Sequence, residues 1–295
     1  MLKALLGIAP QRERDGSFRP SRLALRLATS DVTGYENCSY EAYQGKRSKI
    51  IVLFTEQKNM TMKNGREFST GNHPVEALLP MLHLKNAGFD FEIVTPTGKP
   101  VVFEMWAMPT KDAAVLAVYK ELKSRFEQPK SLQLVVDSLD GQAGSYAALF
   151  IPGGHGAMLG LPDDQNVATV LRWAHNNELF TISLCHGPGA FLATTLGSRE
   201  FLYCGYEMAV FPDAVDKKTP WVGYLPGQMP SELGAQLEKL GAKIINSKAD
   251  ATCCLDRKLI TGASPDAANE LGKLAAMTLL EHLNTVESGA APETP

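Results

Sequence analysis

Residues 49–96, KIIVLFTEQKNMTMKNGREFSTGNHPVEALLPMLHLKNAGFDFEIVTP, decide the class of fold. The continuous apolar run within residues 49–54 has the length of a buried strand, and residues 89–96, FDFEIVTP, are expected to form a second strand. Between them we expect a helix within residues 68–89, because Pro74 suits the first turn of a helix. A strand, a helix and a strand in succession predict a right-handed crossover between parallel strands.

The same alternation continues through the rest of the chain. Further strands are expected at 146–154, 179–185 and 207–213, with helices near 164–177 and 187–196, and a helix and strand follow Ser231. A last strand and a long helix close the pattern, in KLITGASPDAANELGKLAAMTLLEHLNTV. This order predicts an α/β fold, a sandwich of helices around a mostly parallel sheet, with ligands bound at the carboxyl ends of the strands.

One stretch interrupts this alternation. Residues 101–141 contain two expected helices but little strand. We expect them to pack with residues 1–45 as a small cap domain. The α/β catalytic core would then comprise residues 46–100 and 142–286, followed by a disordered tail at 287–295.

The composition excludes several classes of protein. The chain has 295 residues, 44% of them hydrophobic, and a net charge of −3, which excludes a wholly disordered protein and argues against a nucleic-acid surface. No apolar run approaches the roughly 20 residues that span a bilayer. Five cysteines are too few and too scattered for a disulfide framework, so we expect a reducing compartment, the cytoplasm.

The most informative local pattern is TISLCHGPGAF, residues 181–191. An apolar strand leads directly into Cys185, His186 and a helix, which is the arrangement of a nucleophile elbow. A helix N-terminus and a neighbouring histidine both lower the pKa of a thiol, so we expect a reactive thiolate at Cys185. The alternative is a buried cysteine with a structural role.

A second glycine-rich turn follows the strand in FIPGGHGA, residues 150–157. Backbone N–H groups around Gly153, Gly154 and His155 could bind a developing oxyanion. On its own this pattern is equally typical of a tight turn before a helix.

Acidic residues near two other strand ends are candidates for proton transfer. Glu76 lies at a helix start just after His73, where it could share a proton with a thiolate or serve only to complement the helix dipole. Asp213 and Asp216 follow the strand at 207–213, and either could orient His186 or remain a solvated loop acid.

Together these segments resemble the ThiJ/PfpI superfamily, and within it the long-chain bacterial branch of holding chaperones that double as glyoxalase III and protein deglycase. The resemblance covers about residues 45–285 and rests on STGNHPVE, FEMWAMPTKD, FIPGGHGA, ISLCHGP, FPDAVDKKTP and LITGASPDAANELGKLAA. It implies a flavodoxin-like three-layer sandwich with a small cap domain, and a homodimer.

The resemblance also implies roles for individual residues. Cys185 would be the nucleophile, His186 its base, Asp216 the acid that orients this histidine, and Glu76 the carboxylate beside the thiol. Backbone amides near Gly153, Gly154 and His186, with His155 adjacent, would form the oxyanion pocket.

The sequence departs from the branch at one site. The branch carries a metal site of two histidines and one carboxylate, and the aligned positions here are Lys85, Asp90 and about Leu122. Lysine and leucine are not zinc ligands at neutral pH, so we predict that this metal site is lost and that the protein has no cofactor.

The leading hypothesis is glutathione-independent conversion of methylglyoxal to lactate through a hemithioacetal on Cys185, with related protein deglycase activity. A peptidase or amidase using the same Cys-His-Asp site is one alternative. A holding chaperone that binds unfolded proteins without ATP is another, and a redox sensor is a third.

Overall fold

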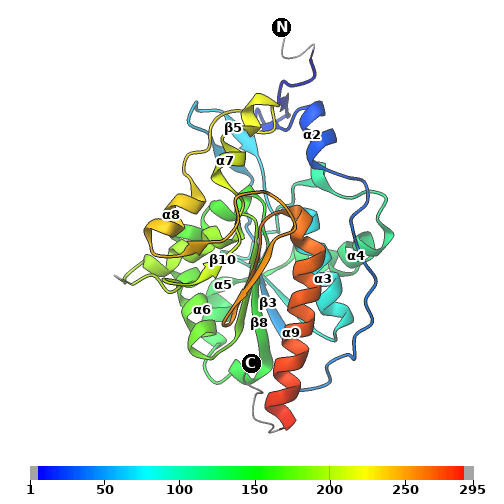
Figure 1. The fold of residues 1–295 in the computed structure, drawn as a ribbon, viewed down its shortest axis with the longest axis vertical. Coiled ribbons are helices and arrows are strands. Elements are labelled where there is room, and N and C mark those ends of the chain that lie inside the picture. The colour runs from blue at the N-terminus through cyan, green and yellow to red at the C-terminus, as the bar shows by residue number, and fades with distance from the viewer. Residues whose placement is uncertain (1–5, 199, 289–295) are drawn as a thin grey trace.

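The centre of the molecule is a seven-stranded sheet with the strand order β12-β13-β9-β8-β3-β6-β7 (Figure 1). The structure is a computed structural model that describes residues 6–198 and 200–288. All strands are parallel except β12, which runs antiparallel to β13. Their bounds are β3 (Lys49–Leu53), β6 (Asp90–Thr95), β7 (Lys130–Ser131), β8 (Tyr146–Ile151), β9 (Phe180–Leu184), β12 (Cys253–Asp256) and β13 (Leu259–Gly262).

Helices cover both faces of this sheet. The α-helices are α2 (Arg22–Ala28), α3 (Pro74–Asn86), α4 (Ala113–Glu127), α5 (Leu132–Ser138), α6 (Gln165–Asn176), α7 (Asp213–Asp216), α8 (Leu233–Lys239) and α9 (Ala268–Ser288). Short 3₁₀ helices are η1 (Met105–Ala107), η2 (Ala143–Ser145), η3 (His155–Met158), η4 (Leu161–Asp163), η5 (Gly187–Thr195), η6 (Thr219–Trp221) and η7 (Pro265–Ala267).

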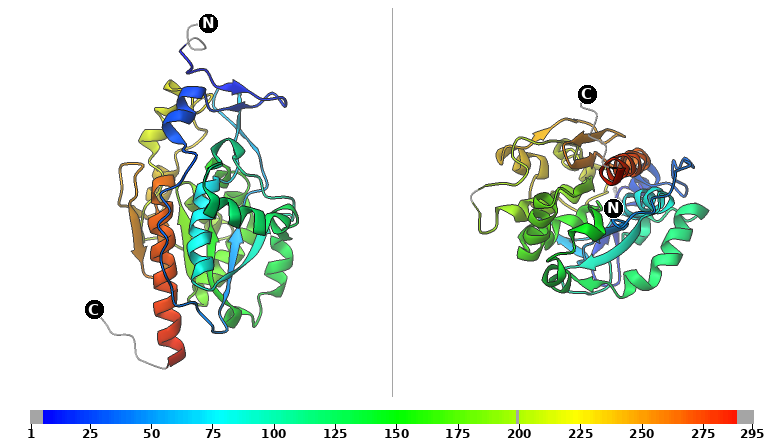
Figure 2. Two further views of the ribbon diagram at one scale, coloured as in Figure 1. Left: turned by 90° about the vertical axis from the view of Figure 1, so that its right-hand side faces the viewer. Right: turned by 90° about the horizontal axis from the view of Figure 1, so that it is seen from below.

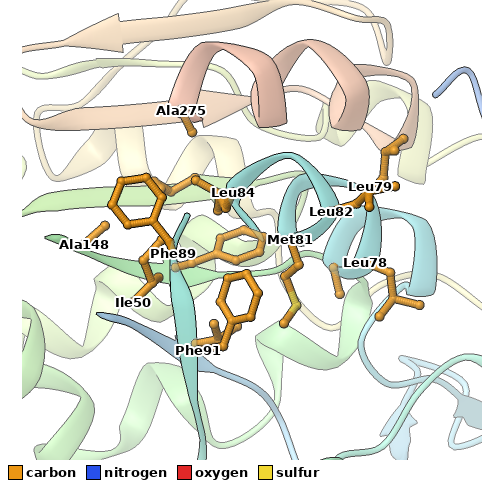
Figure 3. Packing of buried hydrophobic residues seen from close by; sticks show 14 of the residues in the cluster. Ile50, Leu78, Leu79, Met81, Leu82, Leu84, Phe89, Phe91, Ala148 and Ala275 are labelled. Carbon is orange, nitrogen blue, oxygen red and sulfur yellow. The ribbon is translucent and has the colours of Figure 1, made fainter. Parts of the chain in front are cut away.

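Two apolar cores result from the alternation of side chains along the strands. Ile50 on β3 is buried in a core with side chains of α3, α4 and α9, and Figure 3 shows it close to Phe89, Met81 and Leu84. Its neighbour Ile51 is buried in the opposite core with side chains of α5, α6 and η5. The structure is therefore a three-layer α/β sandwich, and the predicted fold class is confirmed.

A second sheet brings together two distant parts of the chain. Its order is β1-β2-β5-β4, from β1 (Gln11–Arg12), β2 (Phe18–Arg19), β4 (Asn59–Thr61) and β5 (Glu67–Ser69). Met60 of β4 and Phe68 of β5 are buried in a small apolar cluster that also contains Met62, Leu225 and Met229. A third, two-stranded sheet joins β10 (Glu207–Met208) to β11 (Lys243–Ile244), so the strand expected at 207–213 is short and lies outside the main sheet.

The packing of residues 101–141 differs from the expectation. Val115 and Phe126 of α4 are buried in the same core as Ile50, and Leu132 of α5 is buried in the core that contains Ile51. Strand β7 extends the main sheet beside β6. Of the N-terminal strands, β1 pairs with β2 and β2 pairs with β5. Strand β5 follows β3 in the sequence, within the range expected for the catalytic core. The division into domains remains a prediction, and residues 289–295 of the expected tail lie outside the described residues.

The N-terminal segment then follows α3 and α9 along the outside of the sandwich (Figure 2). Tyr40 Oη lies 2.8 Å from His83 Nδ1 on α3. Tyr43 donates a hydrogen bond of 2.6 Å to Glu287 near the end of α9. These buried and half-buried contacts attach residues 29–48 to the helical layer although the segment has no regular structure of its own.

Two expectations about composition can be compared with the structure. None of the helices in residues 6–198 and 200–288 is long and apolar enough to cross a membrane. All five cysteines have free thiols, which agrees with the absence of a disulfide framework: Cys38, Cys185, Cys204, Cys253 and Cys254.

Candidate active site

Cys185 occupies a strained turn at the carboxyl end of β9. Its φ angle is +59°, a left-handed conformation that is rare outside glycine. The turn is fixed from both sides, because Cys185 N–H donates to Gly262 O at 2.8 Å and Phe211 N–H donates to Cys185 O at 3.0 Å. The predicted nucleophile turn is therefore present. The short helix expected at 187–196 is present as the 3₁₀ helix η5.

His186 and Asp216 extend from this cysteine as a connected set. The Cys185 Sγ atom lies 3.2 Å from His186 Nδ1, and His186 Nε2 lies 2.8 Å from Asp216 Oδ2. All three side chains are buried. Asp213 is directed elsewhere, since its carboxylate accepts the backbone N–H groups of Gly234 and Ala235 at the start of α8. Of the two candidate acids, the structure brings only Asp216 to His186.

His155 has a contact that the sequence did not reveal. We expected it beside an oxyanion pocket, but its Nε2 atom lies 3.0 Å from Asp216 Oδ1. Asp216 thus bridges two imidazoles whose ring centroids are 4.0 Å apart. Phe68 of the second sheet packs edge-on against His155, with 5.5 Å between ring centroids. The second sheet therefore closes this side of the histidine pair.

Glu76 lies in the first turn of α3, beside the cysteine. The helix begins after His73, whose N–H donates to Gly153 O at 2.9 Å, so the glycine turn after β8 holds the start of α3. Gly153 separates the two reactive groups: a Cβ atom at this position would collide with Glu76 Oε2 and would lie 2.8 Å from Cys185 Cβ. The three sequence segments that carry Glu76, Gly153 and Cys185 therefore meet at one point.

Burial sets the protonation of the Glu76–Cys185 pair. Burial raises the pKa of Glu76 well above its usual range, while the Cys185 thiol and the Gly154 N–H oppose this rise. Burial also raises the pKa of the Cys185 thiol, and the charge of Glu76 raises it further. The expectation of a lowered thiol pKa is therefore wrong, because loss of solvation outweighs the helix end and the histidine. Both shifts favour the protonated, uncharged forms of the two groups.

Gly153→Ala is expected to destabilise the protein and to reduce its activity. The added methyl group would lie 2.5 Å from Leu184 O and would also overlap Glu76 Oε2, and overpacking of this kind costs about 1–3 kcal/mol. Urea unfolding should show this loss. Gly144→Ala is the matched control, because a Cβ at Gly144 meets nothing within 4 Å. Equal stability of both variants would contradict the packing described here.

Glu104 is a second buried carboxyl group that the sequence analysis did not select. It is 1% exposed, and its Oε1 atom accepts a 2.6 Å hydrogen bond from the Thr70 hydroxyl. Burial raises the pKa of Glu104 to about 7, although His155 and Thr70 oppose this rise. The sequence contains a signal for it, because Glu104 is an acidic residue inside the otherwise apolar run VVFEMWAMP, a position at which a carboxyl group is often buried.

Glu104→Gln is expected to stabilise the protein at alkaline pH. The carboxyl pKa is 4.5 without burial and about 7 in the folded protein, so the unfolded chain loses this proton first. The contribution of Glu104 to stability therefore falls as the pH rises between these values, by roughly 3 kcal/mol in all. Urea unfolding should show little difference from the native chain near pH 4 and a more stable variant near about pH 8.

The control is Glu41→Gln, which makes the same chemical change at an exposed position. A Glu104→Gln variant with the same pH dependence of stability as the native chain would show that Glu104 ionises in the folded protein as it does in water.

A cavity of about 380 Å³ opens beside the site. His73 lines it together with residues 28–36 of the N-terminal segment and residues 265–270 before and within α9. Burial lowers the pKa of His73 to about 3, so its imidazole is neutral. His73 immediately precedes the first turn of α3, which carries Glu76, so the cavity lies beside the start of this helix.

The residues at the expected metal positions do not fit a divalent cation. Lys85 forms an ion pair with Glu121, Asp90 forms one with Arg125 at 2.7 Å, and Leu122 is buried in the apolar core. In the described part of the chain, the group spaced to hold a metal is His155, His186 and Asp216. Their polar atoms already bind one another.

Comparisons with known proteins agree with this geometry. Residues 69–277 match the DJ-1/PfpI family. The chain is 48% identical to protein/nucleic acid deglycase 1 of Escherichia coli strain K12 over 267 residues, 90% of this chain and 93% of that protein. The same values hold for protein/nucleic acid deglycase HchA of Escherichia coli O157:H7.

Solved structures are similar in fold. Glyoxalase III from Candida albicans has a TM-score of 0.61 and 20% identity, over 79% of this chain and 98% of that one. The Rapid Encystment Protein of Francisella tularensis has a TM-score of 0.64 and 20% identity, over 79% and 99%. With the family match and the 48% identity, these findings establish that the chain belongs to the DJ-1/PfpI family.

Proposed function

We propose that the protein is a glutathione-independent glyoxalase III that converts methylglyoxal to lactate, with protein deglycase activity at the same site. The observation that carries the proposal is the connected set Cys185–His186–Asp216 beside the buried carboxyl of Glu76. A thiol with a base on one side and a proton-sharing acid on the other suits covalent chemistry on an aldehyde followed by proton transfer.

The first step forms the carbon–sulfur bond. The thiol proton passes to Glu76 or His186, and Cys185 Sγ attacks the aldehyde carbon of methylglyoxal. The oxygen of that aldehyde then becomes negatively charged, and the N–H of Gly154, which faces Cys185, stabilises it before it takes up the proton. The product of this step is a hemithioacetal.

The second stage is an isomerisation. Glu76 or His186 removes the proton from the former aldehyde carbon, giving an enediol, and a proton returns to the neighbouring carbon. The result is a lactoyl thioester of Cys185. Water hydrolyses this thioester, releases lactate and restores the thiol.

The deglycase activity extends the same chemistry to modified proteins. The relatives of 48% identity are named protein/nucleic acid deglycases. An aldehyde-derived adduct on lysine, arginine or cysteine presents the same two-carbon unit to Cys185. The cavity of about 380 Å³ beside His73 has room for a side chain that carries such an adduct.

The experiment that tests the proposal measures lactate from methylglyoxal in buffer without glutathione, together with release of lactate from a methylglyoxal adduct of N-acetylarginine. Catalytic formation from both substrates is expected. Lactate from methylglyoxal alone would remove the deglycase part. No lactate from either substrate would overturn the proposal.

Several finer properties remain predictions that this proposal includes. We expect a cytoplasmic homodimer that takes part in the stress response, that binds neither nucleic acid nor membrane, and that also binds unfolded proteins as a holding chaperone. The peptidase and redox-sensor alternatives use the same thiol, and the lactate assay separates both from the proposed reaction.

A further inference from the structure

Buried polar atoms without hydrogen-bond partners are concentrated in one place. In the described part of the chain they are His73 Nδ1, both carboxylate oxygens of Glu76, and Glu104 Oε2. An unpaired buried polar atom costs about 1–3 kcal/mol, so folded proteins rarely keep several together. Such a concentration indicates that a bound molecule supplies the missing partners.

Glu104 is held firmly although one of its oxygens is free. Its N–H donates to Asn72 O at 3.0 Å, and a β-bridge joins Asn72 to Phe103. Its Oε1 atom accepts from Thr70, as described above, and the Gly71 N–H also donates to the carboxylate. The carboxyl therefore has a fixed position, in which Oε2 has no close hydrogen-bond partner.

The segment that holds Glu104 forms a wall of the active site. Gly156 N–H donates to Gly71 O at 3.0 Å, so residues 70–73 pack against the glycine turn that faces the cysteine. The Tyr224 ring lies 6.0 Å from the His155 ring and 5.8 Å from the ring of Trp106, two positions after Glu104, measured between centroids. Glu104 is thus held on the segment that packs against the turn beside the reactive thiol.

We propose that Glu104 is a further catalytic residue, which in its protonated form donates a hydrogen bond and then a proton to the ketone oxygen of the dicarbonyl substrate. The inference rests on the proposed function, and it assigns a proton donor to the ketone oxygen, the second oxygen of the same substrate. His73 Nδ1 is also unpartnered and belongs to the same wall of the site. It forms a hydrogen bond with the hydroxyl group that the ketone oxygen becomes.

The proton balance of the step is closed. In the hemithioacetal, ionised Glu76 takes the proton from C1, the C1–H electron pair forms the C1–C2 double bond, and the ketone oxygen takes the proton of Glu104. Glu76 then delivers its proton to C2, while the hydroxyl at C1 becomes the thioester carbonyl. The proton released from that hydroxyl returns to Glu104, so both carboxyl groups are ready for hydrolysis and the next cycle.

The protonation of Glu104 agrees with this role. Its pKa of about 7 leaves a large fraction of the acid form at neutral pH. The titratable groups that face it are His155 from η3, Glu76 from α3 and Tyr224. Because a proton donor must be protonated, turnover of methylglyoxal should decline as the pH rises through this value.

The test compares Glu104→Gln with the native chain and with Glu104→Asp. Native protein that forms no lactate would overturn the proposed function itself, independently of Glu104. Where native protein is active, Glu104→Gln should lower kcat by about 10²-fold or more with a smaller change in KM. Its remaining activity should lack the decline above neutral pH, and Glu104→Asp should recover part of kcat.

A thiol-protection measurement separates chemistry from structure. Methylglyoxal should protect Cys185 from alkylation by iodoacetamide in Glu104→Gln at least as well as in the native chain, because addition precedes the blocked step. Loss of both protection and lactate formation would show a structural role and overturn the inference. Native kcat in Glu104→Gln would also overturn it. If this variant does not fold, Thr70→Val is the substitute, because it removes the hydroxyl that binds the Glu104 carboxyl. It should lower kcat and shift the pH at which activity declines. A native pH profile in Thr70→Val would refute the inference.

Discussion

Cys185→Ala is expected to lower lactate formation from methylglyoxal by at least about 10⁴-fold, because the variant has no atom that can form the hemithioacetal. The substitution removes only the sulfur, and alanine keeps the same Cβ in the turn between β9 and η5. Folding should therefore be retained. The measurement is the rate of lactate formation without glutathione, with circular dichroism to confirm the native fold.

Cys204→Ala is the matched control for this experiment. Cys204 is an exposed thiol, which methylglyoxal can reach without entering the active site. We expect this variant to retain native activity. Equal lactate formation by Cys185→Ala and the native chain would remove Cys185 from the mechanism and refute the covalent route.

Asp216→Asn is expected to reduce kcat by about 10³- to 10⁴-fold with little effect on folding. Asp216 accepts a hydrogen bond from an imidazole on each oxygen, at 2.8 Å from His186 and 3.0 Å from His155. An asparagine offers one acceptor and one NH₂ group, so one of the two histidines loses its acceptor. Where this is His186, the ring proton moves to Nδ1, and this nitrogen can no longer accept the proton of the thiol.

Asp213→Asn provides the comparison, because Asp213 lies three positions earlier and binds backbone N–H groups of α8 rather than a histidine. Its kcat should stay near the native value. A large loss of kcat in Asp213→Asn with native kcat in Asp216→Asn would show that the roles of the two acids are the reverse of those described here.

The arrangement of the core could be predicted because its elements have strong periodicity. Strands β3 and β8 lie in apolar runs, and β6 and β9 are short segments rich in apolar and β-branched residues. Helices α3 and α6 lie where Pro74 and Asp164 indicate a helix start. The second sheet could not be predicted, since its strands have two or three residues and show no alternation. Helix α2 was also missed, since the sequence analysis assigned residues 1–45 to the cap domain without predicting a helix there.

The active site was predictable as far as local patterns reach. The turn at Cys185 follows from a strand that ends in small residues, and the position of His186 follows from its place beside the cysteine. The partner of His155 and the choice between Asp213 and Asp216 depend on tertiary contacts that no local pattern contains. The protonation of Cys185 and Glu104 depends on burial. The residue type alone does not show whether a thiol or a carboxyl group is buried or exposed.

Trapping the covalent intermediate tests the central claim most directly. The native protein would be mixed with methylglyoxal without glutathione, quenched with acid during turnover, digested at low pH and analysed by peptide mass spectrometry. The account predicts a lactoyl thioester on the peptide that contains Cys185, which is absent when Asp216→Asn or a thiol-blocking reagent prevents attack. Lactate formation with no adduct on Cys185, or with adduct only on an exposed thiol such as Cys204, would contradict it.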